Sequence, residues 1–327
     1  MKRWVRHFGL LLGVVATVAF VFYAIRTLRG QDLSHYVSAS AIAGIGIAAV
    51  GYSLIVPLSA LAWRRLLSDM GVSRNWGELS IIMSVTQLAK YIPGNVGQHI
   101  GRAAMSLARG IPLRPYGISV LSEAALAVLA ATITGIAGCG LSGMGSGILK
   151  GHGAMTLPVV LILAGTFVLA AVLARRTLPM LLHRLAPKRD RDGAHHAMPR
   201  KSGLAYALVA YILNYLVFGT GITIMAMMLL PGQHAQWLLL TGCFALAWVI
   251  GFFAPGAPAG LGVREGLMLA LLQFSYTRPD ALLIVIALRL ATTVGDILCF
   301  LAGSAALFLS GGRTRRNAAS HSIGNRQ

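Results

Sequence analysis

The sequence is poor in charge, and above all in acidic charge. Of its 327 residues only 11% are charged, and nine Asp and Glu residues stand against 28 Lys and Arg residues. A soluble domain carries roughly a quarter charged residues, whereas apolar windows of about 20 residues recur along this chain. These features exclude a soluble globular protein and predict an integral membrane protein.

The chain also lacks the signatures of several kinds of enzyme. Its three cysteines, Cys139, Cys243 and Cys299, show no Cys-x-x-Cys spacing and are expected to be packing residues. No Gly-x-x-x-x-Gly-Lys loop for ATP occurs, and no Asp/Glu or His/Cys cluster has the spacing of a metal site. The pair His195-His196 is a weak metal signal by itself. We therefore expect neither a cofactor nor a metal.

Hydropathy predicts one polytopic, all-α integral membrane domain over residues 1–327. Its N-terminal apolar run ends in Arg26 and Arg29 without a small-x-small cleavage site, which favours an uncleaved first span over a signal peptide. The six expected spanning helices are residues 8–28, 39–62, 115–139, 154–174, 204–230 and 280–310.

Two further apolar stretches are interrupted by proline and glycine. The interruptions are Pro93 and Gly94 within residues 76–109, and Pro255 and Gly256 within residues 236–273. Pieces of about 13 residues are roughly 20 Å long, too short for a hydrocarbon core of about 30 Å. Broken backbone at that depth must be buried in protein or line a wet cavity. We expect two re-entrant helical hairpins.

The basic residues predict the topology. With both termini in the cytoplasm, most Lys and Arg fall in cytoplasmic segments, among them a basic linker at 175–203 and a tail at 311–327. This positive-inside bias accounts for the net charge of +19 without a nucleic-acid partner. The basic residues left outside are Arg26, Arg29, Lys150 and Arg278.

In this topology the two hairpins enter from opposite sides of the membrane. Each half, about 1–139 and 154–310, then holds two spans, a hairpin and a further span. The expected fold is therefore an inverted-topology repeat, as in many secondary transporters. A Gly-rich stretch at 135–153 is expected to be an outer loop between the halves.

Seven ionisable residues fall within the membrane segments. Each costs about 2.5–3.5 kcal/mol at a helix centre on insertion scales, so these groups must pair or face a polar cavity. Arg102 and Arg264 stand nine residues after Pro93 and Pro255, near half-helix N-termini that favour anions. The seven are Lys90, Arg102, Glu123, Arg264, Glu265, Arg289 and Asp296. The expected substrate-binding residues are Arg264, Glu265, Arg102, Pro93, Gly94, Pro255, Gly256, Gly260, Gly262, Glu123, Arg289 and Asp296.

Polar stripes on several helices indicate a shared interior cavity. A structural alternative is open at this point: Arg264–Glu265 and Arg289–Asp296 could be ion pairs that only hold helices together. The stripes are Ser119 with Glu123, Tyr211 with Asn214 and Tyr215, and Arg289 with Thr293 and Asp296.

The two interrupted stretches also carry a family resemblance. The segment APGAPAGLGVREGLM resembles the Pro-Gly-Gly-x-Gly-x-Arg-Glu segment of the membrane region of lysylphosphatidylglycerol synthases, a family also called flippase-like. KYIPGNVGQHIGRA is similar to its earlier Tyr-(x)-Pro-Gly element. Ala257 and Pro258 depart from the family pattern, which has glycine or a small residue there. The resemblance implies movement of a lipid across the bacterial cytoplasmic membrane, and it does not imply lysyl transfer.

The leading hypothesis is a flippase-like transporter of a phospholipid or a polyprenyl-phosphate-linked substrate. Its anionic headgroup would be held by Arg264, Arg102 and half-helix N–H groups, while Glu265, Glu123 and Asp296 balance charge or take a coupling proton. Two alternatives are a membrane transferase acting on a lipid-linked sugar and an accessory partner of a cell-envelope biosynthesis enzyme.

Overall fold

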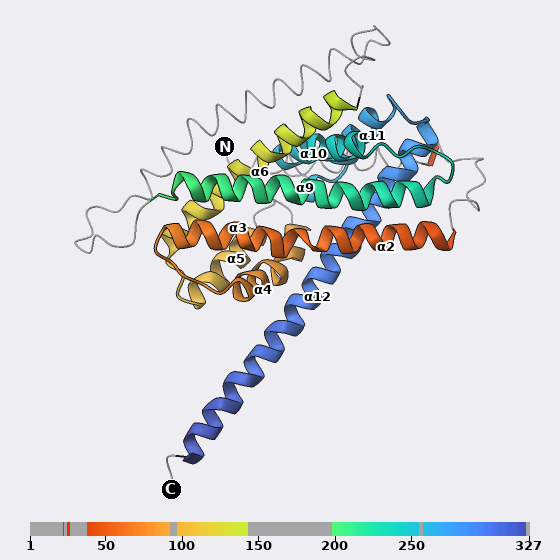
Figure 1. Cartoon of the computed structure of the whole chain (residues 1–327). Coiled ribbons are helices and arrows are strands. Elements are labelled where there is room, and N and C mark those ends of the chain that lie inside the picture. The colour runs from red at the N-terminus through yellow and green to blue at the C-terminus, as the bar shows by residue number, and fades with distance from the viewer. Residues whose placement is uncertain are drawn as a thin grey trace.

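The computed structural model describes residues 22, 25, 26, 38–91, 97–142, 198–254 and 258–324, with side chains as far as Leu309. Within these ranges the regular elements are helices (Figure 1). All but three residues of the expected span at 8–28 lie outside the described residues, as do the expected span at 154–174, most of the linker at 175–203 and His195-His196.

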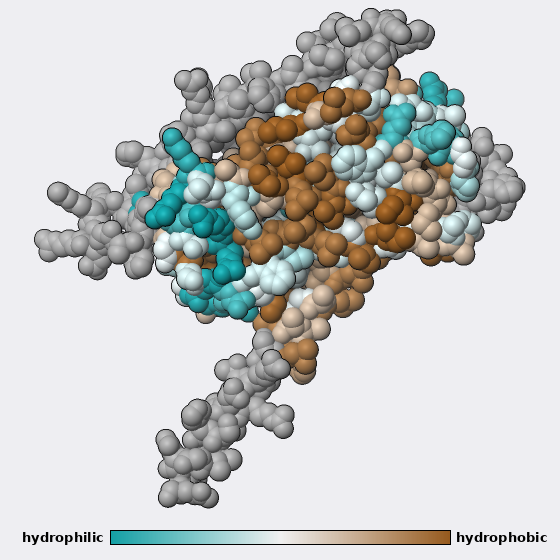
Figure 2. Space-filling model, viewed as in Figure 1, coloured by the Kyte–Doolittle hydropathy of each residue, from teal (hydrophilic) through white to brown (hydrophobic). Residues whose placement is uncertain are grey.

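Four helical stretches are long and apolar enough to cross a membrane. Figure 2 shows hydrophobic surface over the middle of the bundle and hydrophilic residues gathered toward its two ends. The protein is therefore a multi-pass integral membrane protein. The four stretches are Ala39–Asp69, Leu113–Leu141, Lys201–Leu229 and Arg278–Leu309, and they match the expected spans at 39–62, 115–139, 204–230 and 280–310.

The first of these stretches consists of α2 (Ala39–Ser53) and α3 (Ile55–Asp69). The break arises because Pro57 has no N–H to donate to the carbonyl of Ser53. The thiol of Cys299 donates to that carbonyl at 3.5 Å. All three cysteines are free, and Cys299 thus satisfies the backbone group that the proline leaves open.

The glycines near residue 135 belong to a helix, which corrects the expected start of the outer loop. α6 (Leu113–Leu141) packs against α10 (Trp237–Phe253), and a Cβ on Gly138 would lie 2.9 Å from the Cα of Gly242. Glycine is needed here because the two backbones approach each other, so tertiary packing overrides the loop-like composition.

This close approach gives a test of the packing. Gly138→Ala should lower the free energy of unfolding by about 1–3 kcal/mol, because its methyl group overlaps α10. Gly140→Ala on the same helix meets nothing within 4 Å and should be neutral or slightly stabilising. Thermal unfolding in detergent compares the two variants. Equal behaviour of the two would contradict the packing.

Each interrupted stretch forms a pair of short helices. α4 (Trp76–Val85) and the 3-10 turn η2 (Gln87–Tyr91) precede α5 (Gly97–Ala108). α10 precedes the 3-10 turn η3 (Pro258–Gly260) and α11 (Val263–Leu272). α10 has 17 residues, more than expected, yet at 1.5 Å per residue its length of about 25 Å stays below a hydrocarbon core of about 30 Å.

Both interrupted elements return to the end from which they start. In the first, Arg109 at the end of α5 forms an ion pair with Glu78 at the start of α4, at 3.7 Å. In the second, the side-chain amide of Gln233 before α10 donates to Asp280 after α11, at 2.8 Å. Each element is therefore a helical hairpin in shape.

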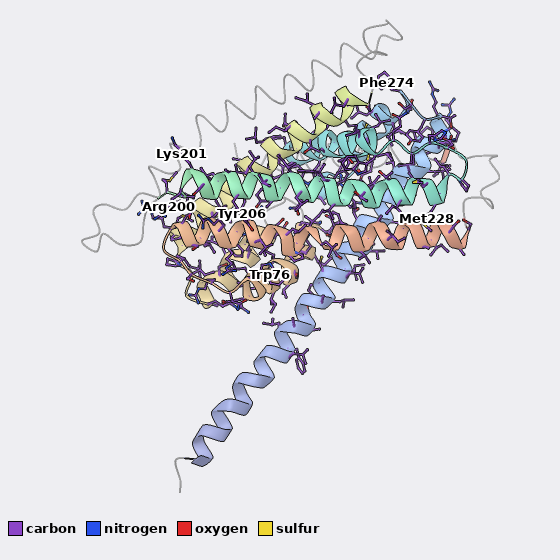
Figure 3. The ribbon with its side chains drawn as sticks, in the orientation of Figure 1. Trp76, Arg200, Lys201, Tyr206, Met228 and Phe274 are labelled. Atoms are coloured by element: carbon purple, nitrogen blue, oxygen red, sulfur yellow. The ribbon has the colours of Figure 1, made fainter. Side chains whose placement is uncertain are left out.

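The two hairpins start from opposite ends of the bundle. α9 (Lys201–Leu229) runs beside α2 and α3 over its whole length. Asp69, which precedes the first hairpin, accepts from the backbone N–H of Arg200 at one end of α9. Ser40 donates to the carbonyl of Met228 at the other end, where the second hairpin follows. Figure 3 shows Arg200 far from Met228 and Phe274.

The last helix of each half packs on the hairpin of the other half. α6 lies against α10, and α12 (Arg278–Gly324) lies against α4 and α2. Gly303 of α12 allows the close contact with α4, because a Cβ there would lie 3.1 Å from the backbone nitrogen of Val85. α12 continues to Gly324, so much of the expected tail at 311–327 prolongs this helix (Figure 1).

Candidate functional site

A cavity of about 430 Å³ lies where the two hairpins meet α6 and α9. Three basic side chains line it, Lys90, Arg102 and Arg264, and Glu123 supplies a carboxylate. The remaining wall includes the aromatic side chains of Tyr52, Tyr211, Trp248 and Phe252. Polar groups from both hairpins therefore face one interior space.

The second hairpin reaches this cavity through a tight backbone turn. Ala259, Gly260 and Gly262 all have positive φ, at 52°, 72° and 79°. Gly260 also lies against α10, where a Cβ would be 3.1 Å from the Cα of Gly251. The N–H of Gly262 donates to the carboxylate of Glu265 at 2.7 Å and so starts α11. Arg264 consequently lies in the first turn of this half-helix.

Arg102 of α5 and Glu123 of α6 form a buried ion pair. Their Nη2 and Oε2 atoms are 2.6 Å apart, and the two side chains are 5% and 8% exposed. The hydroxyl of Tyr211 on α9 donates to the other carboxylate oxygen at 3.0 Å. The guanidinium lies 3.6 Å from the ring centroid of Trp63. This cluster joins α3, α5, α6 and α9 at the buried side of the cavity.

Asp296 of α12 is the centre of a second buried cluster. Its carboxylate accepts from the ammonium of Lys90 at 2.6 Å, the hydroxyl of Tyr91 at 2.6 Å and the amide of Gln87 at 3.1 Å. Lys90 also donates to the hydroxyl of Tyr52 at 2.9 Å. All three donors to Asp296 come from η2, so this cluster fixes the first hairpin to α12.

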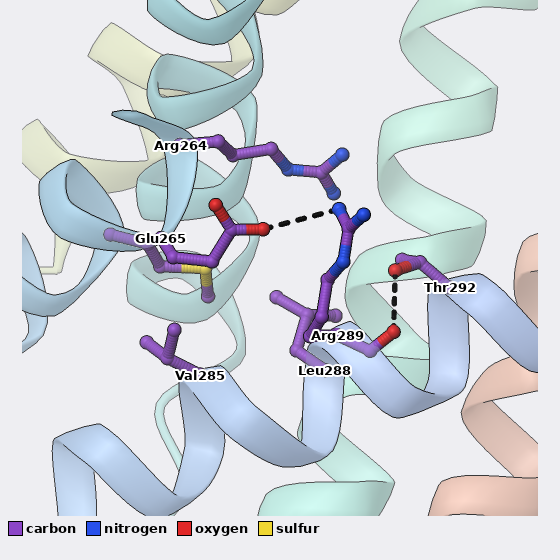
Figure 4. Close-up of a pocket in the computed structure, with 7 residues that line it drawn as sticks. Arg264, Glu265, Val285, Leu288, Arg289 and Thr292 are labelled. Carbon is purple, nitrogen blue, oxygen red and sulfur yellow. Dashed lines mark hydrogen bonds and ion pairs between the residues drawn. The ribbon is translucent and has the colours of Figure 1, made fainter. Parts of the chain in front are cut away.

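Glu265 of α11 and Arg289 of α12 form a third pair, at 3.2 Å (Figure 4). Arg264 extends past this pair, and its guanidinium lies 4.5 Å from the ring centroid of Phe244. Within the part of the chain that the structure describes, no carboxylate lies within ion-pair distance of Arg264. Arg264 is thus a cavity-lining cation that the neighbouring carboxylates do not neutralise.

These contacts differ from the pairs considered in the sequence. Arg264 and Glu265 do not pair with each other, because consecutive residues of a helix point in different directions. Arg289 and Asp296 are seven residues apart, about 10.5 Å along the axis, and each pairs with a hairpin instead. Ion pairs do connect the helices. In the described ranges they use the three carboxylates Glu123, Glu265 and Asp296, and Arg264 has no carboxylate partner.

The predicted site residues divide into three groups. Arg102, Glu123, Gly260 and Arg264 line the cavity. A second group does not line the cavity but belongs to the neighbouring ion pairs and turn: Glu265, Arg289, Asp296 and the turn residue Gly262. The residues outside the described ranges are Pro93, Gly94, Pro255 and Gly256.

Two contributors were missed as site residues. Gln87 and Tyr91 hold Asp296 together with Lys90. Gln87 stands three residues before Lys90 and four before Tyr91 within an apolar stretch. This spacing was the available signal, because it places Gln87 on the same helix face as each of them. Among the described residues, no group of three or more His, Cys, Asp and Glu side chains could hold a metal ion.

The chain was compared with known proteins and families. No curated protein matches it. Residues 10–303 match the family described as lysylphosphatidylglycerol synthase TM region. The match extends over both hairpins, the cavity and the three charge clusters, as well as nearly all of the long apolar helices. The chain therefore belongs to the lysylphosphatidylglycerol synthase TM region family.

Proposed function

We propose that this protein is a flippase-like transporter that moves a phospholipid or a polyprenyl-phosphate-linked lipid across the bacterial cytoplasmic membrane. The anionic headgroup binds in the cavity, with Arg264 as its principal contact. The observation that carries this proposal is Arg264, the cation that has no ion-pair partner after the carboxylates at the site have been paired, counting the described residues.

The charge balance of the site favours an anionic ligand. With all groups ionised, the four cations Lys90, Arg102, Arg264 and Arg289 face only three carboxylates. An unneutralised cation within a membrane is costly, and a bound phosphate would offset that cost. The guanidinium of Arg264 suits phosphate because it can donate two parallel hydrogen bonds. The volume of about 430 Å³ lies within the range of ligand pockets.

Arg102 takes a different part in this proposal. It lines the same cavity, but Glu123 already neutralises it at 2.6 Å. Its charge becomes available to a headgroup only when Glu123 takes up a proton. The proposed role of the Arg102–Glu123 pair is therefore to respond to the coupling proton. Arg264 contacts the phosphate whether or not Glu123 is protonated.

The fold proposed for this function is an inverted-topology repeat with two re-entrant hairpins. Two observations support it. The hairpins start from opposite ends of the bundle, and each half places an ion pair between its second half-helix and the following span. That pair is Arg102–Glu123 in the first half and Glu265–Arg289 in the second, with the signs exchanged. Such repeats are the basis of alternating access in many transporters.

Basic residues give the proposed orientation. Arg64, Arg65, Arg74, Arg109, Arg114, Arg200 and Lys201 gather at the end where the first hairpin starts, and Arg278 lies at the other end. The positive-inside rule places the first end in the cytoplasm.

Single-cysteine variants in a cysteine-free background test this topology. Ser73 and Ala108 flank the first hairpin, Gln236 and Ser275 flank the second, and all four residues are exposed. In oriented vesicles a membrane-impermeant thiol reagent should label the first two positions only from the cytoplasmic side and the last two only from the outer side. Labelling of the two ends of either hairpin from opposite sides would contradict a re-entrant arrangement.

Transport itself is tested in liposomes with labelled lipids. The purified protein should move an anionic phospholipid or a polyprenyl phosphate between leaflets, and Arg264→Gln should slow it at least about tenfold, the loss expected for one charge-assisted contact of about 1.4 kcal/mol. Arg64→Gln, at an exposed arginine outside the cavity, serves as the control and should retain the wild-type rate.

Two results would overturn the proposal. One is a wild-type protein that moves neither lipid. The other is an Arg264→Gln variant that moves lipid as fast as the control. Recovery of a covalently changed lipid, or transport only in the presence of a co-purifying enzyme, would favour the transferase or the accessory role instead.

A further inference from the structure

The cavity has an opening that can be located from the exposure of its walls. Of the residues that line it, His99 of α5 and Phe252 of α10 are exposed, and Phe252 is 42% exposed. Arg102 and Glu123, which also line it, are buried. The cavity therefore opens between the N-terminal part of α5 and the C-terminal part of α10.

Apolar side chains surround this opening. Ile100, next to His99, is 64% exposed. Phe252 stacks on Trp248 with ring centroids 5.2 Å apart. In a membrane protein an opening bordered by exposed apolar and aromatic side chains faces hydrocarbon. This opening is thus lateral and leads into the bilayer.

Small residues on α6 keep the opening free. α6 and α10 touch closely where Gly138 meets Gly242. Farther along, Ala124 and Ala127 of α6 line the cavity together with Trp248 and Phe252 of α10. Ala124 and Ala127 are three residues apart and so share one face of the helix. Two methyl groups at this level leave space that larger side chains would fill.

We propose that the acyl or polyprenyl chains of the substrate leave the cavity through this lateral opening, passing Ala124, Ala127 and Phe252, while the phosphate stays at Arg264. The inference rests on the proposed function for the identity of the headgroup. It adds that the ligand is an amphiphile whose chains remain in the bilayer, and that the opening, separate from the charged site, selects for those chains.

A substitution that fills the opening distinguishes the contribution of the chains to binding from that of the headgroup. The probes are dioleoyl phosphatidic acid, which has both headgroup and chains, and glycerol 3-phosphate, which has the headgroup alone. Ala124→Trp should weaken binding of the long-chain probe by about tenfold or more, equivalent to about 1.4 kcal/mol, and change binding of glycerol 3-phosphate by less than about twofold. Binding is measured on the purified protein in detergent.

Control variants make the outcome specific. Ala137→Trp places the same side chain at an exposed position of the same helix, away from the cavity, and should leave both probes unaffected. Arg264→Gln should weaken both probes. If Ala124→Trp does not give a monodisperse protein, Ala127→Leu replaces it as a smaller obstruction with the same expected direction.

The outcomes distinguish the inference from the proposed function. If Ala124→Trp weakens neither probe, or both equally, the lateral opening is wrong while the headgroup site stands. If Arg264→Gln leaves both affinities unchanged, the headgroup site is wrong. If the wild-type protein binds neither probe, both proposals are overturned.

Discussion

Replacing Glu123 by leucine should destabilise the protein by about 3–5 kcal/mol. The substitution leaves the guanidinium of Arg102 buried without its carboxylate, and it removes the acceptor of the Tyr211 hydroxyl. Breaking one side of a buried ion pair is more costly than losing an exposed pair, because the remaining charge keeps its desolvation penalty. Thermal or denaturant unfolding of the purified protein in detergent measures the loss.

A double variant separates this cause from a simple loss of packing. Arg102→Met together with Glu123→Leu removes both charges and should recover most of the stability that Glu123→Leu loses, because no unpaired charge remains. If the double variant is as unstable as Glu123→Leu alone, the ion pair is not the reason for the loss. A loss below about 1 kcal/mol in the single variant, the range of exposed pairs, would show that water reaches the pair.

The second large effect is expected from Asp296→Asn. The change keeps the shape of the side chain but removes the charge that neutralises Lys90. Its NH2 group also replaces one of the two oxygens, which accept from Lys90 and Gln87 (Oδ1) and from Tyr91 (Oδ2). Asp296 is fully buried, so we expect a loss of about 3–5 kcal/mol. Unfolding of the variant in detergent measures this loss, and liposome assays should show slower transport because η2 is no longer fixed to α12.

A matched control for this change lies on the first hairpin, which the Asp296 cluster holds to α12. Glu78→Gln removes the carboxylate of the Glu78–Arg109 pair, whose side chains are 28% and 24% exposed at a separation of 3.7 Å. That pair should contribute about 0–1 kcal/mol. Equal destabilisation by Asp296→Asn and Glu78→Gln would show that the Asp296 cluster is not a buried one.

The long helices and the hairpin interruptions could be predicted because their signals are local. A run of apolar residues specifies a span, and a proline followed by a glycine ends a helix whatever lies beside it. The presence of Arg264 in the wall of the cavity could be anticipated in the same way, because its place after Pro255 and its charge within an apolar stretch are visible in the sequence; its role in binding stays a prediction. The coarse architecture therefore depends little on tertiary contacts.

The ion-pair partners could not be predicted, because they depend on contacts between elements far apart in the chain. Lys90 pairs with Asp296 because α12 packs against η2, and Glu265 pairs with Arg289 because α11 packs against α12. Gly138 was expected in a loop for the same reason, since its role is set by Gly242 on another helix. Ion-pair partners and helix packing therefore cannot be predicted from single segments of the sequence.

The exchange of signs between the halves is a further consequence of packing. Arg102 and Glu265 both lie on the second half-helix of their hairpin, and each pairs with the following span. Glu265 pairs with Arg289, while the next residue back, Arg264, points in another direction, with its guanidinium over the ring of Phe244. Among the described residues, Arg264 is the cavity arginine that neither of the two pairs uses.

The most direct test of a phosphate held at Arg264 is photo-crosslinking with an anionic phospholipid that carries a diazirine beside its phosphate. After irradiation of the protein in liposomes, peptide mass spectrometry should find adducts on cavity-lining residues of α5, α10 and α11, and Arg264→Gln should remove most of them. Adducts confined to the outer surfaces of the helices, or cavity adducts that persist unchanged in Arg264→Gln, would contradict a headgroup site at this arginine.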